Sequence, residues 1–413
     1  MKLSLSELEY EKLKLKEELG EKLSYERKEV ALNDHHAVKP PVHCGLTVHS
    51  VVGCTFRCVY CYSPDMGFDI TKAQPYALSG EEITYALLNN EFYLPGLKGT
   101  YLAFGSIGEP LYPNGLYRTF EYIETFSRLL RNPLQLSTKT AVSEEIARRL
   151  ASISRGSLTP LVSAITLSYH HVLEPGAPAP LKRLEGIKFM RKAGLQPMLF
   201  LRPLLPGFEQ EVPELLKKAK KYGATAVVLG SLRVTPSILA RLKSAGVDIA
   251  PVLNRVKREL KAGIQLSVRS EDLKNYAVKE ARKVGLVPLL SACCANTLNL
   301  HLSLGVRIPC MGLDFIDGRF CTRCPVGCEK IRVEVDTGDV KRAVKNYLKI
   351  EAFEVIDEGR QLLISVRNRN RARRLLFERI GYKRLLETAF RKRLVISEGQ
   401  SIKEFTDKNT DES

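Results

Sequence analysis

Between residues 46 and 246 the sequence repeats one pattern six times: a short apolar run is followed by a longer stretch with apolar residues at helical spacing. This alternation is typical of parallel sheets whose strands are joined by right-handed helical crossovers. The predicted strands are residues 46–52, 100–104, 134–138, 161–167, 197–201 and 224–229. The sequence therefore predicts an α/β fold in which six β/α units either curl into a partial barrel or form an open, doubly wound sheet.

Polar residues follow the predicted strands at the points where the strands end. Gly108 and Glu109 come after the second strand, Lys139 after the third, Ser168 after the fourth and Arg202 after the fifth. Because the carboxyl ends of parallel strands meet at one edge of a sheet or barrel, we expect these side chains to lie close together. The sequence therefore predicts one site at that edge.

The first strand leads into residues 53–63, GCTFRCVYCYS, in which Cys54, Cys58 and Cys61 have C-x3-C-x2-C spacing. A 4Fe–4S cluster is normally held by four cysteine thiolates, so three thiolates leave one iron without a protein ligand. The amine and carboxylate of S-adenosylmethionine can bind such an iron, and reductive cleavage of the sulfonium then gives a 5′-deoxyadenosyl radical. This segment is therefore our candidate catalytic loop.

A zinc loop or three structural thiols would also account for the three cysteines. Zinc in structural sites takes four ligands, usually supplied by two paired C-x2-C units. In this sequence the nearby fourth ligand would be Cys44, His43 or His49.

The cysteine spacing, with Tyr60 just before the third cysteine, resembles the motif of the radical-SAM superfamily. Residues 108–110, Gly-Glu-Pro, look like the glycine-rich GGEP segment of that superfamily, with Ile107 where the first glycine usually stands. Segments beginning at residues 136, 173 and 202 are similar to the spore-photoproduct-lyase-like branch. The resemblance covers roughly residues 40–235.

The resemblance implies a partial (β/α)6 barrel and an enzyme that cleaves S-adenosylmethionine with a 4Fe–4S cluster and abstracts hydrogen from a substrate. Cys54, Cys58 and Cys61 would be the cluster ligands. The implied contacts to S-adenosylmethionine come from Tyr60, Gly108, Glu109, Lys139 and Ser168, with Arg202 reaching the cavity. A reductant such as ferredoxin or flavodoxin would supply the electron.

A second group of cysteines lies in the C-terminal third of the chain. Its members are Cys293, Cys294, Cys310, Cys321, Cys324 and Cys328. The last three have C-x2-C-x3-C spacing, and we expect only one of the adjacent pair, Cys294, to be a ligand. The group predicts a second metal site, either a 4Fe–4S cluster or Zn2+, held by Cys294, Cys310, Cys321, Cys324 and Cys328.

The chain has a formal net charge of +17, and residues 367–393 hold eleven Lys or Arg against two Glu. Such an excess attracts polyanions, so RNA or DNA is the expected partner; a merely solvated surface is the alternative. The predicted function is therefore a radical-SAM enzyme acting on nucleic acid, in RNA modification or DNA lesion repair. Two alternatives stay open: a small-molecule or peptide substrate, and a metal-stapled nucleic-acid-binding protein without catalysis.

The expected organisation has five parts in chain order. They are an N-terminal helix and linker (1–40), the radical-SAM core (41–247), an extension with the second cysteine group (248–330), a basic α+β region (331–398) and a disordered tail (399–413). The second cysteine group and the basic region together give a C-terminal cysteine-rich α+β domain. No apolar run is long enough for a membrane span and no secretory signal is visible, so we expect a cytoplasmic protein.

Overall fold

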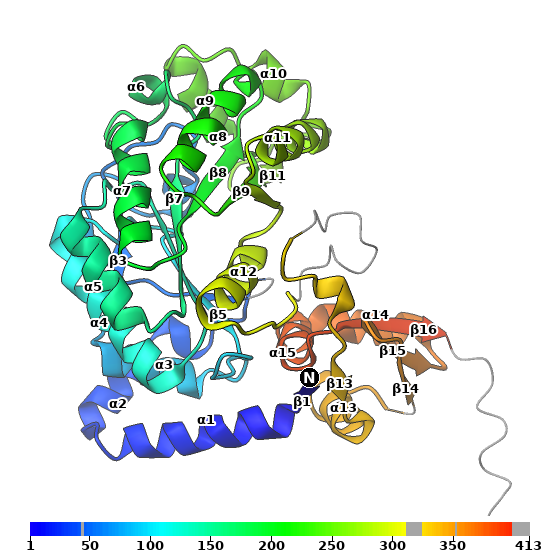
Figure 1. Ribbon diagram of the computed structural model, residues 1–413. Coiled ribbons are helices and arrows are strands. Elements are labelled where there is room, and N and C mark those ends of the chain that lie inside the picture. Colours follow the sequence, from blue (N-terminus) through cyan, green and yellow to red (C-terminus); the bar gives the residue numbers. More distant parts are fainter. Residues whose placement is uncertain (43–44, 311–323, 352, 399–413) are drawn as a thin grey trace, which may run out of the picture.

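The computed structural model describes residues 1–42, 45–310, 324–351 and 353–398 (Figure 1). Within this part of the chain, seven strands form a parallel sheet whose spatial order is β12-β9-β8-β7-β6-β5-β2. Neighbours in space are thus neighbours along the chain, whereas a doubly wound sheet reverses its strand order near its centre. Right-handed crossovers between sequential neighbours all lie on one face, and the sheet curls around the other face. The predicted α/β fold with a central parallel sheet is confirmed, and the strand order favours the partial barrel.

The strands of this sheet match the predicted ones with three differences. They are β2 (Gly45–Thr47), β5 (Tyr101–Phe104), β6 (Leu134–Thr138), β7 (Leu158–Ser163), β8 (Met198–Leu204), β9 (Ala226–Ser231) and β12 (Val287–Leu289). The first predicted strand is broken, because β3 (Val51–Val52) leaves the sheet and pairs antiparallel with β4 (Gln74–Pro75). The fourth begins and ends earlier than predicted, with Pro160 inside it. The prediction of six strands missed β12, whose three residues include a proline and carry no strand signature.

Outer helices cover the convex face of the sheet. They are α3 (Gly80–Asn89), α4 (Leu116–Thr125), α5 (Glu144–Ser154), α7 (Pro180–Lys192), α8 (Val212–Lys221) and α11 (Glu271–Lys283). Their apolar residues share one large core with alternate residues of the strands, such as Val162, Leu199 and Val227. This packing fixes the direction of each strand and therefore the place where each strand ends.

The opposite face of the sheet packs against a single inner helix, α12 (Ala292–Leu304). Leu161, Met198 and Val228, which alternate with the residues facing the outer helices, form a separate apolar cluster with Leu298 of α12. One residue before Leu298, the Thr297 hydroxyl lies 2.9 Å from the Tyr101 hydroxyl at the start of β5. Figure 1 shows α12 beside β5, inside the curve of the sheet.

The N-terminal segment forms two helices where one was predicted. They are α1 (Leu5–Gly20) and α2 (Tyr25–Leu32), and the side chain of Ser24 caps the second. The start of α1 packs into a C-terminal apolar core, whereas Leu19 at its end packs into the core of the sheet. Helix α1 therefore connects two separately packed regions.

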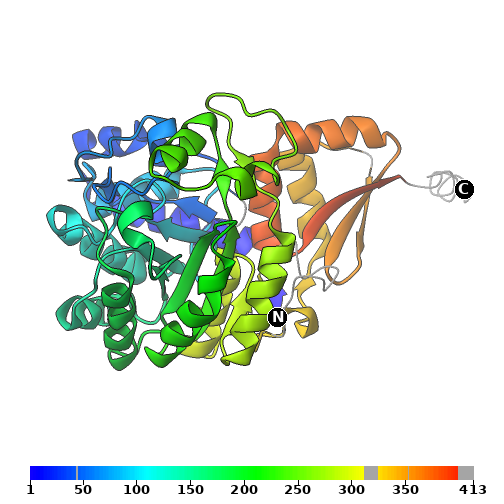
Figure 2. The ribbon, with the colours of Figure 1, turned by 90° about the horizontal axis from the view of Figure 1, so that it is seen from above.

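The C-terminal region has its own three-stranded sheet, ordered β14-β15-β16. Its elements are α13 (Thr337–Ala343), β14 (Phe353–Asp357), β15 (Gln361–Val366), α14 (Arg369–Glu378), α15 (Ile380–Phe390) and β16 (Arg393–Glu398). Figure 2 shows these elements, yellow-orange to red, beside the larger sheet. Cys294, Cys324 and Cys328 of the second cysteine group pack instead in the cluster around α12, so they and this region do not share one core. The predicted disordered tail, 399–413, lies outside the described residues. None of the described helices has the length and apolarity needed to cross a membrane.

Truncation of Leu298 tests whether α12 is a packed part of the barrel. Leu298 is 0% exposed, and Leu302, one turn further along the same helix, is 41% exposed. We expect Leu298→Ala to lower the free energy of unfolding by about 2–5 kcal/mol, because it leaves a cavity against the sheet. Leu302→Ala should change it by no more than about 0.5 kcal/mol. Urea unfolding followed by circular dichroism measures both, and equal effects would contradict the packing of α12.

Candidate functional site

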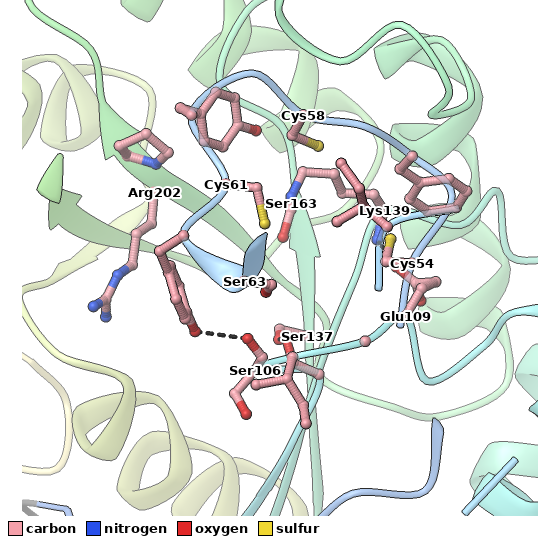
Figure 3. A pocket seen from close by; sticks show the side chains of 18 of the residues that line it. Cys54, Cys58, Cys61, Ser63, Ser106, Glu109, Ser137, Lys139, Ser163 and Arg202 are labelled. Carbon is pink, nitrogen blue, oxygen red and sulfur yellow. Dashed lines mark hydrogen bonds between the residues drawn. The ribbon is translucent and has the colours of Figure 1, made fainter. Parts of the chain in front are cut away.

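A cavity of about 800 Å3 opens at the carboxyl edge of the sheet. Segments that are far apart in the sequence line it, among them the cysteine loop, the residues at the ends of β5, β6, β7, β8 and β9, and Ala292 of α12 (Figure 3). Of the predicted site residues, the lining includes Cys54, Cys58, Tyr60, Cys61, Gly108, Glu109, Lys139 and Arg202. The structure therefore brings together eight of the nine residues predicted for the first site.

Ser168 is the predicted residue that does not line the cavity. Because β7 ends at Ser163, Ser168 lies in the following loop, exposed, with its backbone N–H donating to Glu211 at 2.9 Å. The side chain that the structure places at this strand end is Ser163, which lines the cavity. The error follows from the predicted end of the fourth strand, which was four residues too late.

Two glycines let the cysteine loop lie against the loop that follows β5. Gly53 has a φ of +82°, and Gly53 and Gly108 form a parallel β-bridge. A Cβ atom on Gly108 would lie 2.3 Å from the carbonyl oxygen of Val51, which no real side chain tolerates. The Gly-Glu-Pro segment therefore holds the start of the cysteine loop by close backbone contact.

The three thiols are free and face a site that protein atoms largely surround. Burial raises the pKa of Cys54 to about 11 and that of Cys58 to about 12. A thiol in such a site stays protonated until a metal cation binds and displaces the proton. The environment of these thiols therefore suits metal coordination more than the chemistry of a free thiolate.

The three thiols line the cavity without His49, the described candidate for a fourth zinc ligand. Among the described residues, three metal-binding side-chain atoms come within 4.8 Å of one another at His35, His36 and His49. Of the residues considered as a fourth zinc ligand, His49 lies with the other two histidines, and residues 43 and 44 are outside the described part.

The cysteine loop contacts a buried ion pair, Glu174 and Arg183. Tyr60 donates its hydroxyl to Glu174, and Arg183 Nη2 lies 2.6 Å from the other carboxylate oxygen of Glu174. Both charged side chains are 0% exposed, and Arg183 also donates to the carbonyl oxygens of Ser163 and Pro178. The loop and this segment are joined through their backbones as well, since the N–H of Val59 donates to the carbonyl of residue 173 at 3.0 Å.

Glu174 and Arg183 are functional candidates that the sequence analysis did not assign. They fall within the segments that resemble the lyase-like branch, yet they touch the cysteine loop rather than the cavity. A carboxylate and an arginine flanking a proline-rich stretch were the available signal, but the sequence does not show that they pair with each other and with Tyr60.

Glu109, in the loop after β5, is hydrogen-bonded to the end of β6. Its carboxylate accepts hydrogen bonds from the Thr138 hydroxyl at 2.5 Å, from the Lys139 backbone N–H at 2.8 Å and from the Leu111 N–H at 3.1 Å. Burial raises its pKa. An ionised carboxylate can accept about four hydrogen bonds, so about one position stays available toward the cavity.

The side chain of Lys139 brings a positive charge toward the thiols. Its Nζ lies 5.6 Å from the centre of the Tyr60 ring. Burial lowers its pKa, but Cys58 and Glu174 raise it by more, so the net shift is upward. On the far side of the cavity, Arg202 and Arg233 supply two further cations. The lining therefore contains one buried carboxylate, Glu109, and five basic side chains, because Arg57 and Arg241 line the cavity as well.

The described cysteines of the second group lie near the start of α12 and do not line this cavity. Cys294, in the first turn of α12, has its Sγ 3.7 Å from that of Cys310, and Cys324 and Cys328 pack in the same apolar cluster. Adjacent Cys293 interacts with the hydroxyl of Ser291. Cys321 lies outside the described residues.

Comparisons with known proteins give limited similarity. No family model matches the sequence. An ATP phosphoribosyltransferase from Bacillus licheniformis is 36% identical over 80 residues, which are 19% of this chain and 38% of that enzyme. The chain thus matches well under half the length of this curated relative.

Several solved structures resemble the chain in part. A spore photoproduct lyase mutant with bound AdoMet and dinucleoside spore photoproduct is 15% identical, with a TM-score of 0.49 over 59% of this chain and 76% of that chain. Streptococcus suis SuiB is 15% identical, with a TM-score of 0.38 over 66% and 54%. Native anSMEcpe with bound AdoMet is 13% identical, with a TM-score of 0.38 over 63% and 67%.

Removing one partner of the buried ion pair should destabilise the protein. We expect Arg183→Met to lower the free energy of unfolding by about 3–5 kcal/mol, because it leaves the Glu174 charge buried without a partner. The double variant Glu174→Gln/Arg183→Met should recover part of that loss, as unfolding in urea will show. Lys182→Met is the matched control: its partner Glu185 lies on the same helix, the side chains are 72% and 42% exposed, and the effect should stay below about 1 kcal/mol. Additive effects of the two substitutions at the buried pair would contradict the coupling.

Proposed function

We propose that this chain is a radical S-adenosylmethionine enzyme. The observation that supports the proposal most is the position of the cysteine loop: its three thiols line the same cavity as Glu109 and Lys139 at the carboxyl edge of the sheet. A 4Fe–4S cluster would be held by Cys54, Cys58 and Cys61, with one iron left without a protein ligand. When bound, the cluster supplies the electron that cleaves S-adenosylmethionine.

The residues of the chain would bind and orient S-adenosylmethionine at this edge. Lys139 offers a cation for the methionyl carboxylate, and Glu109 has an acceptor position left for the methionyl ammonium. Gly108 and Tyr60 would shape the wall of the site, and Ser163 takes the place that we expected for Ser168. Arg202 and Arg233 lie on the opposite side, where an anionic part of the cofactor or substrate would meet two positive charges.

The walls of the cavity would protect a radical reaction from solvent. Phe56, Ile70, Phe104 and Phe200 are apolar lining residues, so they would help to exclude water from the site.

The nucleic-acid proposal depends on the exposed cations of residues 367–393, and not all cations of this segment are exposed. Of the cations in residues 367–393, Arg391 is buried, donating to the carbonyl oxygens of residues 98 and 99, and buried Lys392 pairs with Asp357 at 2.5 Å. Arg367, Arg371 and Arg373 remain exposed on and before α14. We propose that α14 contacts the phosphate backbone of an RNA or DNA substrate.

For the second cysteine group we propose a second metal. The 3.7 Å between the sulfurs of Cys294 and Cys310 is close to the roughly 3.8 Å between two thiolates that share one tetrahedral ion. The proposed metal is either Zn2+ or a second 4Fe–4S cluster, with Cys294 and Cys310 among its ligands.

Replacement of Cys58 separates the two metal sites. After anaerobic reconstitution, Cys58→Ala should lose about four iron atoms per chain and all reductive cleavage of S-adenosylmethionine, because two thiolates do not hold the cluster. Cys324→Ala should lose the second metal but keep cleavage within about twofold. Metal analysis and chromatography of 5′-deoxyadenosine after dithionite reduction give both results. Cleavage by Cys58→Ala, or its loss in a folded Cys324→Ala protein, would contradict the proposed division.

The salt dependence of binding tests the nucleic-acid substrate. Each phosphate contact adds about −0.9 to the slope of log K against log salt for duplex DNA. Arg371→Ala/Arg373→Ala should therefore reduce the slope by about 2, measured by fluorescence anisotropy with labelled RNA and DNA. Arg148→Ala/Lys188→Ala removes the same charge from exposed positions on outer helices and should leave the slope unchanged. Salt-independent or absent binding by the unmodified protein would favour a small-molecule or peptide substrate.

A further inference from the structure

Three histidines that play no part in the proposed reaction gather near the N-terminus. His35 and His36 form a short 3-10 turn after α2, and His49 follows β2. One ring nitrogen of each lies within 4.8 Å of the others, and the ring centres are 3.9, 5.1 and 5.2 Å apart. Among the described residues, this is the only group of three possible metal ligands at such close range.

The histidine group is separate from both cysteine groups. None of its members lines the cavity of the cysteine loop. His36 and His49 are 2% and 5% exposed, whereas the His35 side chain is 43% exposed. His36 and His49 would thus be fixed inside the protein, and His35 would face solvent. An ion could therefore reach the site from solvent at His35.

A carboxylate orients one of the rings in the way that metal-binding histidines require. Asp34 Oδ1 lies 2.6 Å from Nδ1 of His36, so His36 donates through Nδ1 and its Nε2 carries the lone pair, which accepts from the His49 N–H at 3.3 Å. The other oxygen of Asp34 accepts from the Tyr76 hydroxyl at 2.5 Å. Histidines that bind metals commonly donate their second ring nitrogen to a carboxylate in this manner, which fixes the tautomer.

We propose that His35, His36 and His49 bind a zinc ion, with Asp34 as the positioning residue for His36. Imidazole nitrogen suits Zn2+, and three histidines with one open position form a known type of zinc site. Nitrogens bound at about 2.0–2.1 Å lie no more than about 4.2 Å apart, so small side-chain rotations bring the three within range. The ion replaces the 3.3 Å contact between His36 Nε2 and the backbone N–H of His49.

The ion would join the N-terminal helices to the first strand of the sheet. His35 and His36 follow α2, while His49 lies five residues before Cys54 in the same chain segment. The site therefore fixes the segment that enters the cysteine loop, without touching the cavity.

The test uses the full chain after anaerobic reconstitution, so that the cysteines already hold their metals. Zn2+ is then titrated by calorimetry into the wild type, His36→Ala/His49→Ala and His170→Ala/His171→Ala. The last variant removes an adjacent pair of histidines on the short helix α6 (His170–Leu173) and serves as the matched control. We expect one additional zinc ion per chain in the wild type and the control, and none in His36→Ala/His49→Ala.

Two further measurements make the result specific. Asp34→Asn should weaken zinc binding by about 10–100-fold while keeping the stoichiometry, as expected for a residue that orients a ligand. Co2+ at the same site should show tetrahedral visible bands without thiolate charge transfer. If the double variant does not fold by circular dichroism, His35→Gln replaces it, because His35 is the exposed member. Equal zinc uptake by all variants, no additional zinc in the wild type, or a cobalt spectrum with sulfur ligation would overturn the proposal.

Discussion

A buried ion pair holds the cysteine loop in place. Glu174 accepts from Tyr60 and forms an ion pair with Arg183, whose Nε and Nη1 donate to backbone carbonyls. Two charges removed from water are stable only when they have such partners. Because Tyr60 lies between Cys58 and Cys61, the position of both thiols depends on residues 114 or more positions further along the chain. The cavity, the spacing of the thiols and the approach of Lys139 all follow from that anchor.

The sequence predicted the strand-end residues well because the rule behind them depends on topology alone. Once parallel strands are joined by helices, their carboxyl ends share an edge wherever the strands begin. Glu109, Lys139 and Arg202 therefore meet in the cavity although their individual strands were known only roughly. Ser168 depended on the end of a single strand, and an error of four residues placed it outside.

The features that the sequence did not reveal are those that arise from pairing across long separations. Nothing local shows that Glu174 meets Arg183 under the loop, or that Asp357 neutralises Lys392 in what reads as a uniformly basic segment. Strand β12 was not predicted for a different reason. Its three residues include a proline and carry no periodicity, and they form a strand by pairing with β9. Each of these features depends on contacts between residues that are far apart in the sequence.

Helix α12 connects the cavity with the second cysteine group. Ala292 lines the cavity, Cys294 lies two residues later, and Thr297 and Asn299 bond to groups near the amino ends of the strands. Shifting this helix would break buried polar contacts that cost about 1–3 kcal/mol each. A metal bound at Cys294 would fix the first turn of the helix in addition, and with it one wall of the cavity. The second cysteine group can therefore influence the shape of the first site even though none of its described thiols lines that cavity.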